Sequence, residues 1–150
     1  EDPVHFREDL PYRPGSPYAA SKASSDLLVR AWARTYGLPV TISNCCNNYG
    51  PLQNEEKFIP AAIESVRCGR CPRLYGDGKN VRDWIHVNDH ARAVWTILNE
   101  GKLGETYLIG ANCERSNLEV LQTILGAMGK PRDFIDWVSD RPGHDRRYAI

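Results

Sequence analysis

Apolar residues in the first third of the chain recur at the spacing of an amphipathic helix. Ser16 is a favourable N-cap and Pro17 a favourable first helical residue. Gly37, followed by Pro39, ends the periodic pattern. The sequence therefore predicts a long helix between Ser16 and Gly37, with its apolar positions at Leu27, Leu28, Ala31 and Trp32.

Three more helices are predicted by the same periodicity. The first has Ile59, Ala62, Ile63 and Val66 on one face. The next is expected to be capped by Asn88 and to bury a stripe formed by Ala91, Val94, Trp95 and Leu98. The last begins at a capping box of Ser116 and Glu119 and continues through Leu118, Leu121, Leu125 and Met128. Gly129 and Pro131 end it.

Short runs of β-branched and aromatic residues lie between these helices. They predict strands over residues 40–43, 83–87 and 106–109, and a polar loop over residues 44–51. Gly76-x-Gly78 is interpreted as a turn. Helices and strands thus alternate along the chain, which is typical of the α/β class with a parallel sheet.

Charge and hydropathy narrow the classes of partner. Nineteen basic and nineteen acidic residues cancel, and no Lys/Arg run is dense enough for a nucleic-acid surface. We therefore expect no nucleic-acid partner. The sequence has neither an apolar run as long as a membrane span nor a signal-peptide pattern, so we expect a cytoplasmic protein without membrane association. Because the chain opens on Glu1, we also expect it to be a piece of a longer protein.

Five cysteines include the C-x-x-C pair Cys68 and Cys71. A structural zinc site would need a second pair of ligands at suitable spacing, and only Cys45, Cys46 and Cys113 remain. An odd number of cysteines without a secretory context favours reduced thiols. We therefore expect no metal.

Tyr18 and Lys22 form the most informative pair in the chain. Four residues apart on a helix, they lie one above the other. A free phenol has a pKa of about 10, and a general base works best near the working pH, so a neighbouring cation is what such a base requires. The alternative is an ordinary aromatic residue beside a solvated lysine. The pair alone does not decide between the two interpretations.

None of the twelve glycines forms the G-x-G-x-x-G pattern of a dinucleotide-binding turn. Two explanations stay open at this point. Either the protein binds no dinucleotide, or the half that binds the pyrophosphate lies before residue 1.

Several motifs together resemble those of a known family. Residues 16–23, SPYAASKA, and the loop NNYGP at 47–51 resemble the extended short-chain dehydrogenase/reductase superfamily. Within it, EKFIP at 56–60, YGDG at 75–78, VRDW at 81–84 and DRPGHDRRY at 140–148 are similar to the dTDP-glucose 4,6-dehydratases. Related epimerases, decarboxylases and GDP-mannose dehydratases share Tyr-x-x-x-Lys but carry different sequences in the last segment.

This resemblance implies an organisation. Residues 1–57 would be the C-terminal part of an NAD-binding Rossmann domain whose first half is absent. Residues 58–150 would mainly form a smaller α/β nucleotide-sugar-binding domain, with about 82–110 returning to the Rossmann domain. The resemblance also implies NAD as cofactor, dTDP-glucose or a related nucleotide sugar as substrate, a homodimer built partly from the Tyr18 helix, and a place in deoxysugar synthesis such as that of rhamnose.

The implied reaction begins with oxidation at carbon 4 of the sugar. Tyr18 would take the proton of the carbon-4 hydroxyl while a hydride goes to NAD, and Lys22 would assist Tyr18 and hold the nicotinamide ribose. The keto group then permits loss of water across carbons 5 and 6, and the hydride returns to carbon 6. The family's Asp-Glu pair for this elimination has no counterpart here, because Glu1-Asp2 and Glu8-Asp9 have the wrong order.

The resemblance also implies binding residues. Asn47 would bind the substrate and Asn48 the cofactor, although both could instead cap a turn. Arg82 would clamp the pyrophosphate, because a guanidinium presents a planar fork to phosphate oxygens; the alternative is a surface arginine paired with Asp83. Asn117 could equally cap a helix. The other residues implied to enclose the nucleotide are Lys57, Phe58, Arg73, Leu74, Tyr75, Asp140, Arg141, Pro142, Gly143 and His144.

Three functions remain in play. The first is a dTDP-glucose 4,6-dehydratase of which this chain is the C-terminal portion, inactive when isolated. The second is a sibling nucleotide-sugar epimerase or decarboxylase. The third is a sugar-nucleotide binding module without catalysis.

Overall fold

The computed structural model describes residues 6–150 as four helices and eight short strands. The helices are α1 (Pro17–Tyr36), α2 (Phe58–Arg67), α3 (Val87–Glu100) and α4 (Asn117–Ala127). The strands are β1 (Ile42–Cys45), β2 (Asn47–Tyr49), β3 (Arg73–Tyr75), β4 (Val81–His86), β5 (Thr106–Ile109), β6 (Glu114–Ser116), β7 (Asp136–Val138) and β8 (Arg147–Tyr148). The predicted α/β class with parallel pairing is confirmed.

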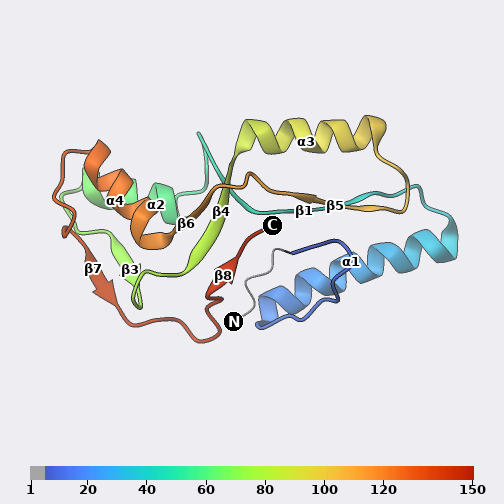
Figure 1. Cartoon of the computed structure of the whole chain (residues 1–150), viewed down its shortest axis with the longest axis horizontal. Coiled ribbons are helices and arrows are strands. Elements are labelled where there is room, and N and C mark those ends of the chain that lie inside the picture. Colours follow the sequence, from blue (N-terminus) through green and yellow to red (C-terminus); the bar gives the residue numbers. More distant parts are fainter. Residues whose placement is uncertain (1–5) are drawn as a thin grey trace.

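Two groups of elements occupy opposite ends of the molecule (Figure 1). In one, the parallel pair β1 and β5 lies between α1 and α3. In the other, α2 and α4 lie beside the parallel pair β3 and β7. β4 lies between the two groups (Figure 1) and pairs with β2 in parallel, with β6 in antiparallel and with β8 in parallel register.

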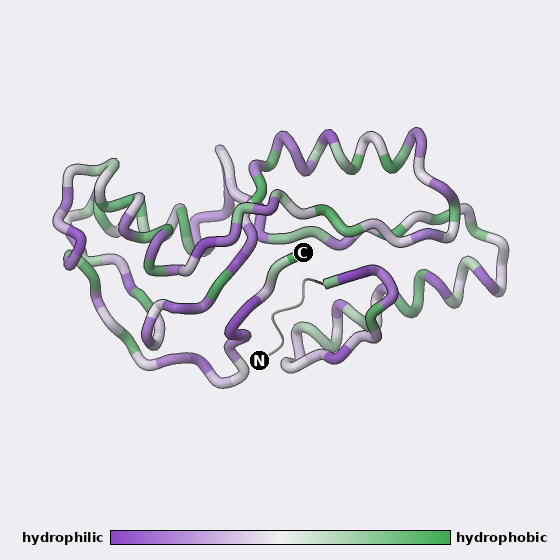
Figure 2. The backbone as a smooth tube through the Cα atoms, viewed as in Figure 1, coloured by the Kyte–Doolittle hydropathy of each residue, from purple (hydrophilic) through white to green (hydrophobic). Residues whose placement is uncertain are grey.

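Each group has its own hydrophobic cluster. Leu121 and Leu125 of α4, both 0% exposed, pack with α2 and β3 residues Ala62, Val66 and Leu74. The second cluster contains Cys46, Ile85 and Ile109, near the ends of β1, β4 and β5. Figure 2 shows hydrophobic segments of the backbone in both groups of elements. The bulk of the apolar burial therefore lies in two centres rather than one.

The start and end of α1 and the start of α4 lie where the capping residues in the sequence predict them. Ser16 Oγ accepts a hydrogen bond from Ala19 N at 3.2 Å, and Gly37 ends α1 with a φ of 70°. The predicted capping box of α4 is present, with Ser116 Oγ accepting from Glu119 N and the Glu119 carboxylate accepting from Ser116 N. Both ends depend on residues within one helical turn, so the sequence is sufficient to locate them.

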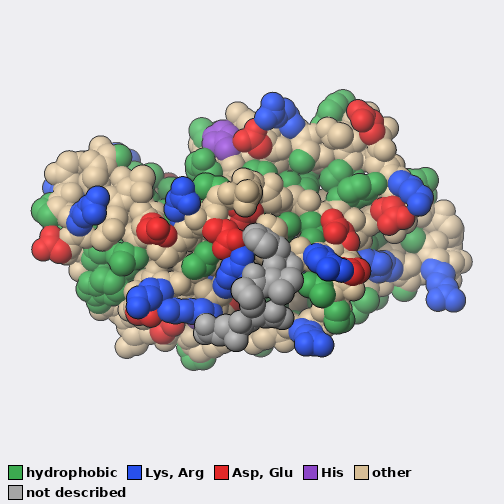
Figure 3. All heavy atoms as spheres, viewed as in Figure 1, with side chains coloured by type: hydrophobic (Ala, Val, Ile, Leu, Met, Phe, Trp, Pro, Cys, Tyr) green, Lys and Arg blue, Asp and Glu red, His purple; other side chains and the backbone are tan. Residues whose placement is uncertain are grey.

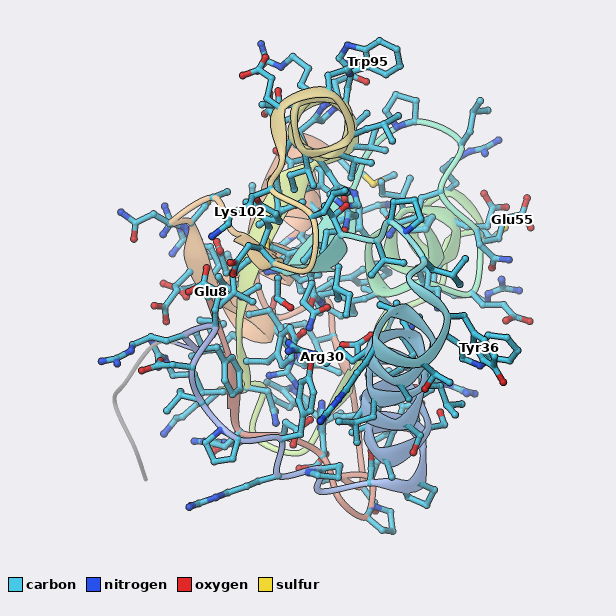
Figure 4. All side chains as sticks on the ribbon, turned by 90° about the vertical axis from the view of Figure 1, so that its right-hand side faces the viewer. Glu8, Arg30, Tyr36, Glu55, Trp95 and Lys102 are labelled. Carbon is cyan, nitrogen blue, oxygen red and sulfur yellow. The ribbon has the colours of Figure 1, made fainter. Side chains whose placement is uncertain are left out.

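The prediction of a buried stripe on α3 is wrong. Trp95 is 67% exposed and Leu98 is 72% exposed, whereas Ala93 and Ile97 on another face pack against the Cys46 cluster. Figure 4 shows Trp95 projecting outward from this helix. The N-cap is His86, whose Nδ1 accepts from Asn88 N, and not the predicted Asn88. Periodicity identifies an apolar face but does not say whether another element covers it.

The apolar positions of α1 are also uncovered. Leu27, Leu28 and Trp32 are each more than half exposed. Trp32 contacts Tyr36 with ring centroids 4.7 Å apart, and Figure 4 shows Tyr36 directed away from the molecule. The predicted first strand is displaced by about two residues, since β1 covers Ile42–Cys45. Within the segment predicted as a polar loop, Asn47–Tyr49 form β2.

Candidate active site

A cavity of about 1020 Å³ opens between the β4 sheet and the α2–α4 group. This volume is at the upper end of the roughly 300–1,000 Å³ range of small-molecule sites. Its walls come from α2, β3, β4, the start of α4 and the segment from Ile135 to His144. The predicted binding residues found in the lining are Asn47, Phe58, Arg73, Leu74, Tyr75, Arg82, Asn117, Arg141 and His144.

The remaining predicted residues lie outside this lining. Lys57 is exposed at the N-cap position of α2. Asp140, Pro142 and Gly143 belong to the turn that carries Arg141 and His144. Tyr18, Lys22 and Asn48 also lie outside the cavity lining. The structure therefore gathers most of the nucleotide-binding candidates in one cavity and leaves the catalytic pair outside its lining.

Arg82 is held by main-chain carbonyls. Its Nη1 donates to Val81 O at 2.7 Å and its Nη2 to Asp145 O at 2.8 Å. Burial lowers the pKa of the guanidinium from its ordinary value, partly offset by the Asp145 charge. Asp83, the alternative partner, instead accepts hydrogen bonds from Ala111 N and Cys113 N and is fully buried. A partly desolvated cation on a cavity wall is suited to binding an anion.

His144 forms a wall of the cavity. Its side chain is 5% exposed, and Nδ1 lies 2.6 Å from Oδ1 of Asp140. The hydrogen bonds from His144 and from the Arg141 main chain lower the pKa of the Asp140 carboxyl. Gly76 faces Asp140 so closely that a Cβ there would lie 2.9 Å from Asp140 Oδ2, so β3 and this turn are in tight contact.

Aromatic and charged side chains border the rest of the cavity. The Arg141 guanidinium carbon lies 5.4 Å from the centre of the Tyr75 ring. Phe58 and Trp84 have ring centroids 6.3 Å apart. Arg73 lies 3.8 Å from Asp136 across the β3–β7 pair, and both side chains are largely exposed. Flat rings beside guanidinium groups suit a ligand that has both a planar base and phosphate.

The asparagine pair lies on β2, where successive side chains point to opposite faces. Asn47 lines the cavity and is in register with Trp84 of β4. The Asn48 amide donates to Cys45 Sγ at 3.2 Å and to Cys46 O at 3.3 Å. Asn48 Oδ1 is buried and has no hydrogen-bond partner within residues 6–150. This orphaned acceptor is suited to a donor from a bound ligand.

Tyr18 and Lys22 lie in the first turns of α1, and Tyr18 is 75% exposed. Burial raises the pKa of the Tyr148 phenol on β8, with smaller contributions from Cys45, Cys46 and Tyr18. Its hydroxyl donates to Cys45 O at 3.4 Å. β8 pairs with β4, which carries Arg82, so Tyr148 lies on the strand beside that of Arg82.

Several lining residues were not predicted. They are Glu56, Ala61, Ala62, Ser65, Arg70, Cys71, Trp84, Ile135 and Asp136. Helical spacing from Phe58 could have indicated Ala61, Ala62 and Ser65, and Trp84 is two positions beyond Arg82 on the same face of β4. Ile135 and Asp136 had no local signal, because only the long-range pairing of β7 with β3 brings them to the cavity.

All five thiols are free. Burial raises the pKa of Cys46 to about 12, with Asp83 adding to the shift, whereas Cys68 and Cys71 are exposed. Within residues 6–150, no group of three His, Cys, Asp or Glu side chains is arranged to hold a metal ion. Acidic and basic side chains are interspersed over the face shown in Figure 3. No helix of the described part is long and apolar enough to cross a membrane.

A family model described as GDP-mannose 4,6 dehydratase matches residues 1–150. The chain belongs to this family. Among curated relatives it is 61% identical, over its full length, to the dTDP-glucose 4,6-dehydratase of Mycolicibacterium smegmatis, of which it covers 45%. The chain thus spans about half the length of the curated relatives that it matches.

Solved structures agree with this family assignment. The chain superimposes with a TM-score of 0.97 and 47% identity on the dTDP-glucose 4,6-dehydratase DesIV of Streptomyces venezuelae, with NAD and TYD bound, and covers 47% of it. It also matches a UDP-glucose 4-epimerase of Thermus thermophilus, in complex with NAD, with a TM-score of 0.88 and 30% identity, and covers 50% of that chain. The predicted resemblance to dTDP-glucose 4,6-dehydratases within a Rossmann-like fold is confirmed.

Proposed function

We propose that this chain is part of a dTDP-glucose 4,6-dehydratase. The observation that carries the proposal is the cavity, in which Arg82, Asn117, Arg141 and His144 come together from β4, α4 and the 140–148 segment. The relatives with 52–61% identity are named dTDP-glucose 4,6-dehydratases. We give these names more weight than the description of the family model, which names GDP-mannose. The product of the complete enzyme would be dTDP-4-keto-6-deoxyglucose.

In this proposal the cavity binds the nucleotide. The Arg82 guanidinium, fixed at two carbonyls and partly desolvated, pairs with the diphosphate. Phe58, Tyr75 and the Arg141 guanidinium enclose the nucleoside, and main-chain groups around Arg73 and Leu74 contact the base edge. Asn47 binds the sugar or the pyrophosphate, and Asn117 and His144 complete the wall. Lys57, Asp140, Pro142 and Gly143 support this enclosure from outside the lining.

Catalysis is assigned to Tyr18 and Lys22. The Tyr18 phenolate takes the proton of the sugar's carbon-4 hydroxyl and becomes a neutral phenol, and the Lys22 ammonium, one helical turn along, stabilises the phenolate form that acts as the base. The residues fit NAD, because the unpartnered Asn48 oxygen offers an acceptor to it and Lys22 a donor to its ribose. When bound, NAD accepts a hydride and later returns it. Glu8 and Asp9 receive no elimination role, and Glu1 and Asp2 lie outside the described residues.

The division of the chain follows from this assignment. Residues 1–57 and about 82–110 belong to the Rossmann domain, and the rest of 58–150 to the nucleotide-sugar domain. The two hydrophobic clusters support this division, since one joins β1, β4 and β5 and the other joins α2, β3 and α4. The exposed α1 residues Leu28 and Trp32 support a homodimer through that helix. The five free thiols favour a cytoplasmic protein, and the proposed product suits deoxysugar synthesis such as that of rhamnose.

One alternative has specific support. The match to a UDP-glucose 4-epimerase at 30% identity favours a sibling enzyme that performs the same first oxidation. The two candidates differ in product, because a dehydratase eliminates water across carbons 5 and 6 and an epimerase returns the hydride to carbon 4.

The deciding experiment incubates the full-length protein with dTDP-glucose and NAD and identifies the product by NMR. A 4-keto-6-deoxy sugar supports the dehydratase. Recovery of dTDP-galactose refutes it in favour of the epimerase. The isolated 150-residue chain serves as the control and is expected to give no product, because it lacks the glycine-rich pyrophosphate turn.

A further inference from the structure

Asn80 joins three segments of the candidate site although it does not line the cavity. It lies immediately before β4 and is 1% exposed. Its side-chain Nδ2 donates to Asp145 O at 3.1 Å, in the segment leading to β8. Its main-chain carbonyl accepts from Asn117 N at 3.0 Å, at the start of α4. This one buried residue therefore contacts both the Asp145 carbonyl and the main-chain N–H of Asn117.

The carbonyl of Asp145 is shared between two donors. Besides the Asn80 amide, it accepts Arg82 Nη2 at 2.8 Å. The other anchor of Arg82, the carbonyl of Val81, belongs to β4 and is fixed by the sheet. The Asp145 carbonyl lies before β8 begins at Arg147, so the Asn80 hydrogen bond helps to fix its place.

We propose that Asn80 is a positioning residue that sets the direction of the Arg82 guanidinium toward the diphosphate of the substrate. It acts through the Asp145 carbonyl and touches no ligand itself. The inference rests on the proposed function, since it assumes that the cavity takes a nucleoside diphosphate.

The unpaired side-chain oxygen of Asn80 supports a role for the side-chain nitrogen, Nδ2. Oδ1 is buried and has no hydrogen-bond partner within residues 6–150. Leaving an acceptor unpaired in the interior costs free energy, so an apolar side chain of the same shape would suit packing alone. What the amide adds at this position is the Nδ2 hydrogen bond that fixes the Asp145 carbonyl.

The experiment measures dTDP affinity by calorimetry in the full-length protein and in Asn80→Leu. Leucine has nearly the shape of asparagine and removes both the donor and the unpaired acceptor. We expect dTDP to bind about tenfold more weakly, with the thermal unfolding temperature little changed. In an Arg82→Ala background the same change is expected to have no further effect on affinity. A merely structural role would give the same loss in both backgrounds.

Asp77→Ala is the matched control. Asp77 pairs with Arg146 in the same segment, at the surface, whereas Asn80 and Arg82 are the residues that donate to the Asp145 carbonyl. We expect less than about a twofold change in dTDP affinity for this variant. If Asp77→Ala weakens binding as much as Asn80→Leu, loosening of the segment is responsible and the inference is overturned.

The remaining outcomes are also decisive. Equal affinity of Asn80→Leu and the wild type overturns the inference and leaves the proposed function standing. Absence of dTDP binding by the wild type overturns the proposed function and the inference together. If Asn80→Leu does not fold, Asn80→Ala removes the same donor without adding a larger apolar group, and the same comparisons apply to it.

Discussion

Arg146 binds Asp77 through both of its amino groups, with Nη1 2.7 Å from Oδ1 and Nη2 3.1 Å from Oδ2. This pair joins the turn after β3 to the segment before β8. The Arg146 hydrogen bonds, helped by the Lys79 main-chain N–H, lower the pKa of Asp77 from 3.8 to about 2. The depressed value makes the contribution of the pair to stability dependent on pH.

For a carboxyl group with a depressed folded-state pKa, the stabilisation is present above the unfolded pKa and is lost as pH falls through the folded pKa. The window here lies between about pH 4 and pH 2. We expect the difference in unfolding free energy between the wild type and Asp77→Asn to be constant near neutrality and roughly halved near pH 3. Urea titrations of both proteins across this range would measure it. A difference that does not depend on pH would contradict the assigned pKa.

Replacement of Arg82 by alanine is expected to weaken binding of a dTDP-sugar by about 2 to 3 kcal/mol, because a charge-assisted hydrogen bond to phosphate is lost. NAD affinity should change little, since Asn48 faces the other side of β2. Calorimetric titration with each ligand checks both statements. An equal loss for the two ligands would indicate misfolding or a shared cofactor role instead.

The five thiols are expected to react at very different rates. Cys68 and Cys71 are exposed, whereas burial and Asp83 raise the pKa of Cys46 to about 12 and so disfavour its thiolate. An aromatic disulfide reagent at pH 8 should modify Cys68 and Cys71 rapidly and Cys46 only after unfolding. Mass spectrometry of tryptic peptides identifies the modified sites, and a Cys68→Ser, Cys71→Ser variant is the control. Rapid native labelling of Cys46 would be incompatible with its burial.

Tyr18→Phe in the full-length protein is expected to lower turnover by two or more orders of magnitude and to leave substrate affinity nearly unchanged. The phenylalanine ring keeps the shape but cannot accept the hydroxyl proton. Steady-state rates and dTDP-glucose binding together separate the two effects. Turnover equal to that of the wild type would end the assignment of Tyr18 as the base.

What the sequence could predict was local. The start of α1 at Ser16 and the capping box at Ser116 depend on hydrogen bonds within four residues, and both are confirmed. Strands β2, β3, β6, β7 and β8 were missed, because they contain two or three residues each and exist only through pairing with distant segments.

The site divides in the same way. Arg82 and His144 could be selected from motif resemblance, and the structure places both in one cavity. The groups that hold Arg82 could not be selected, because the Asp145 carbonyl and the buried Asn80 amide come together only once β8 lies beside β4. The outward faces of α1 and α3 were likewise beyond prediction, since a helical stripe carries no information about what covers it.

We propose that the cavity binds a thymidine nucleotide in preference to other nucleotides. Competing titrations of dTDP and GDP into the full-length protein test this preference most directly, because the family model is named after GDP-mannose, a guanosine nucleotide sugar. We expect saturable binding of dTDP, with GDP binding at least about tenfold more weakly, a preference that one or two hydrogen bonds to the base can supply. Equal binding of the two nucleotides, or preference for GDP, would contradict it.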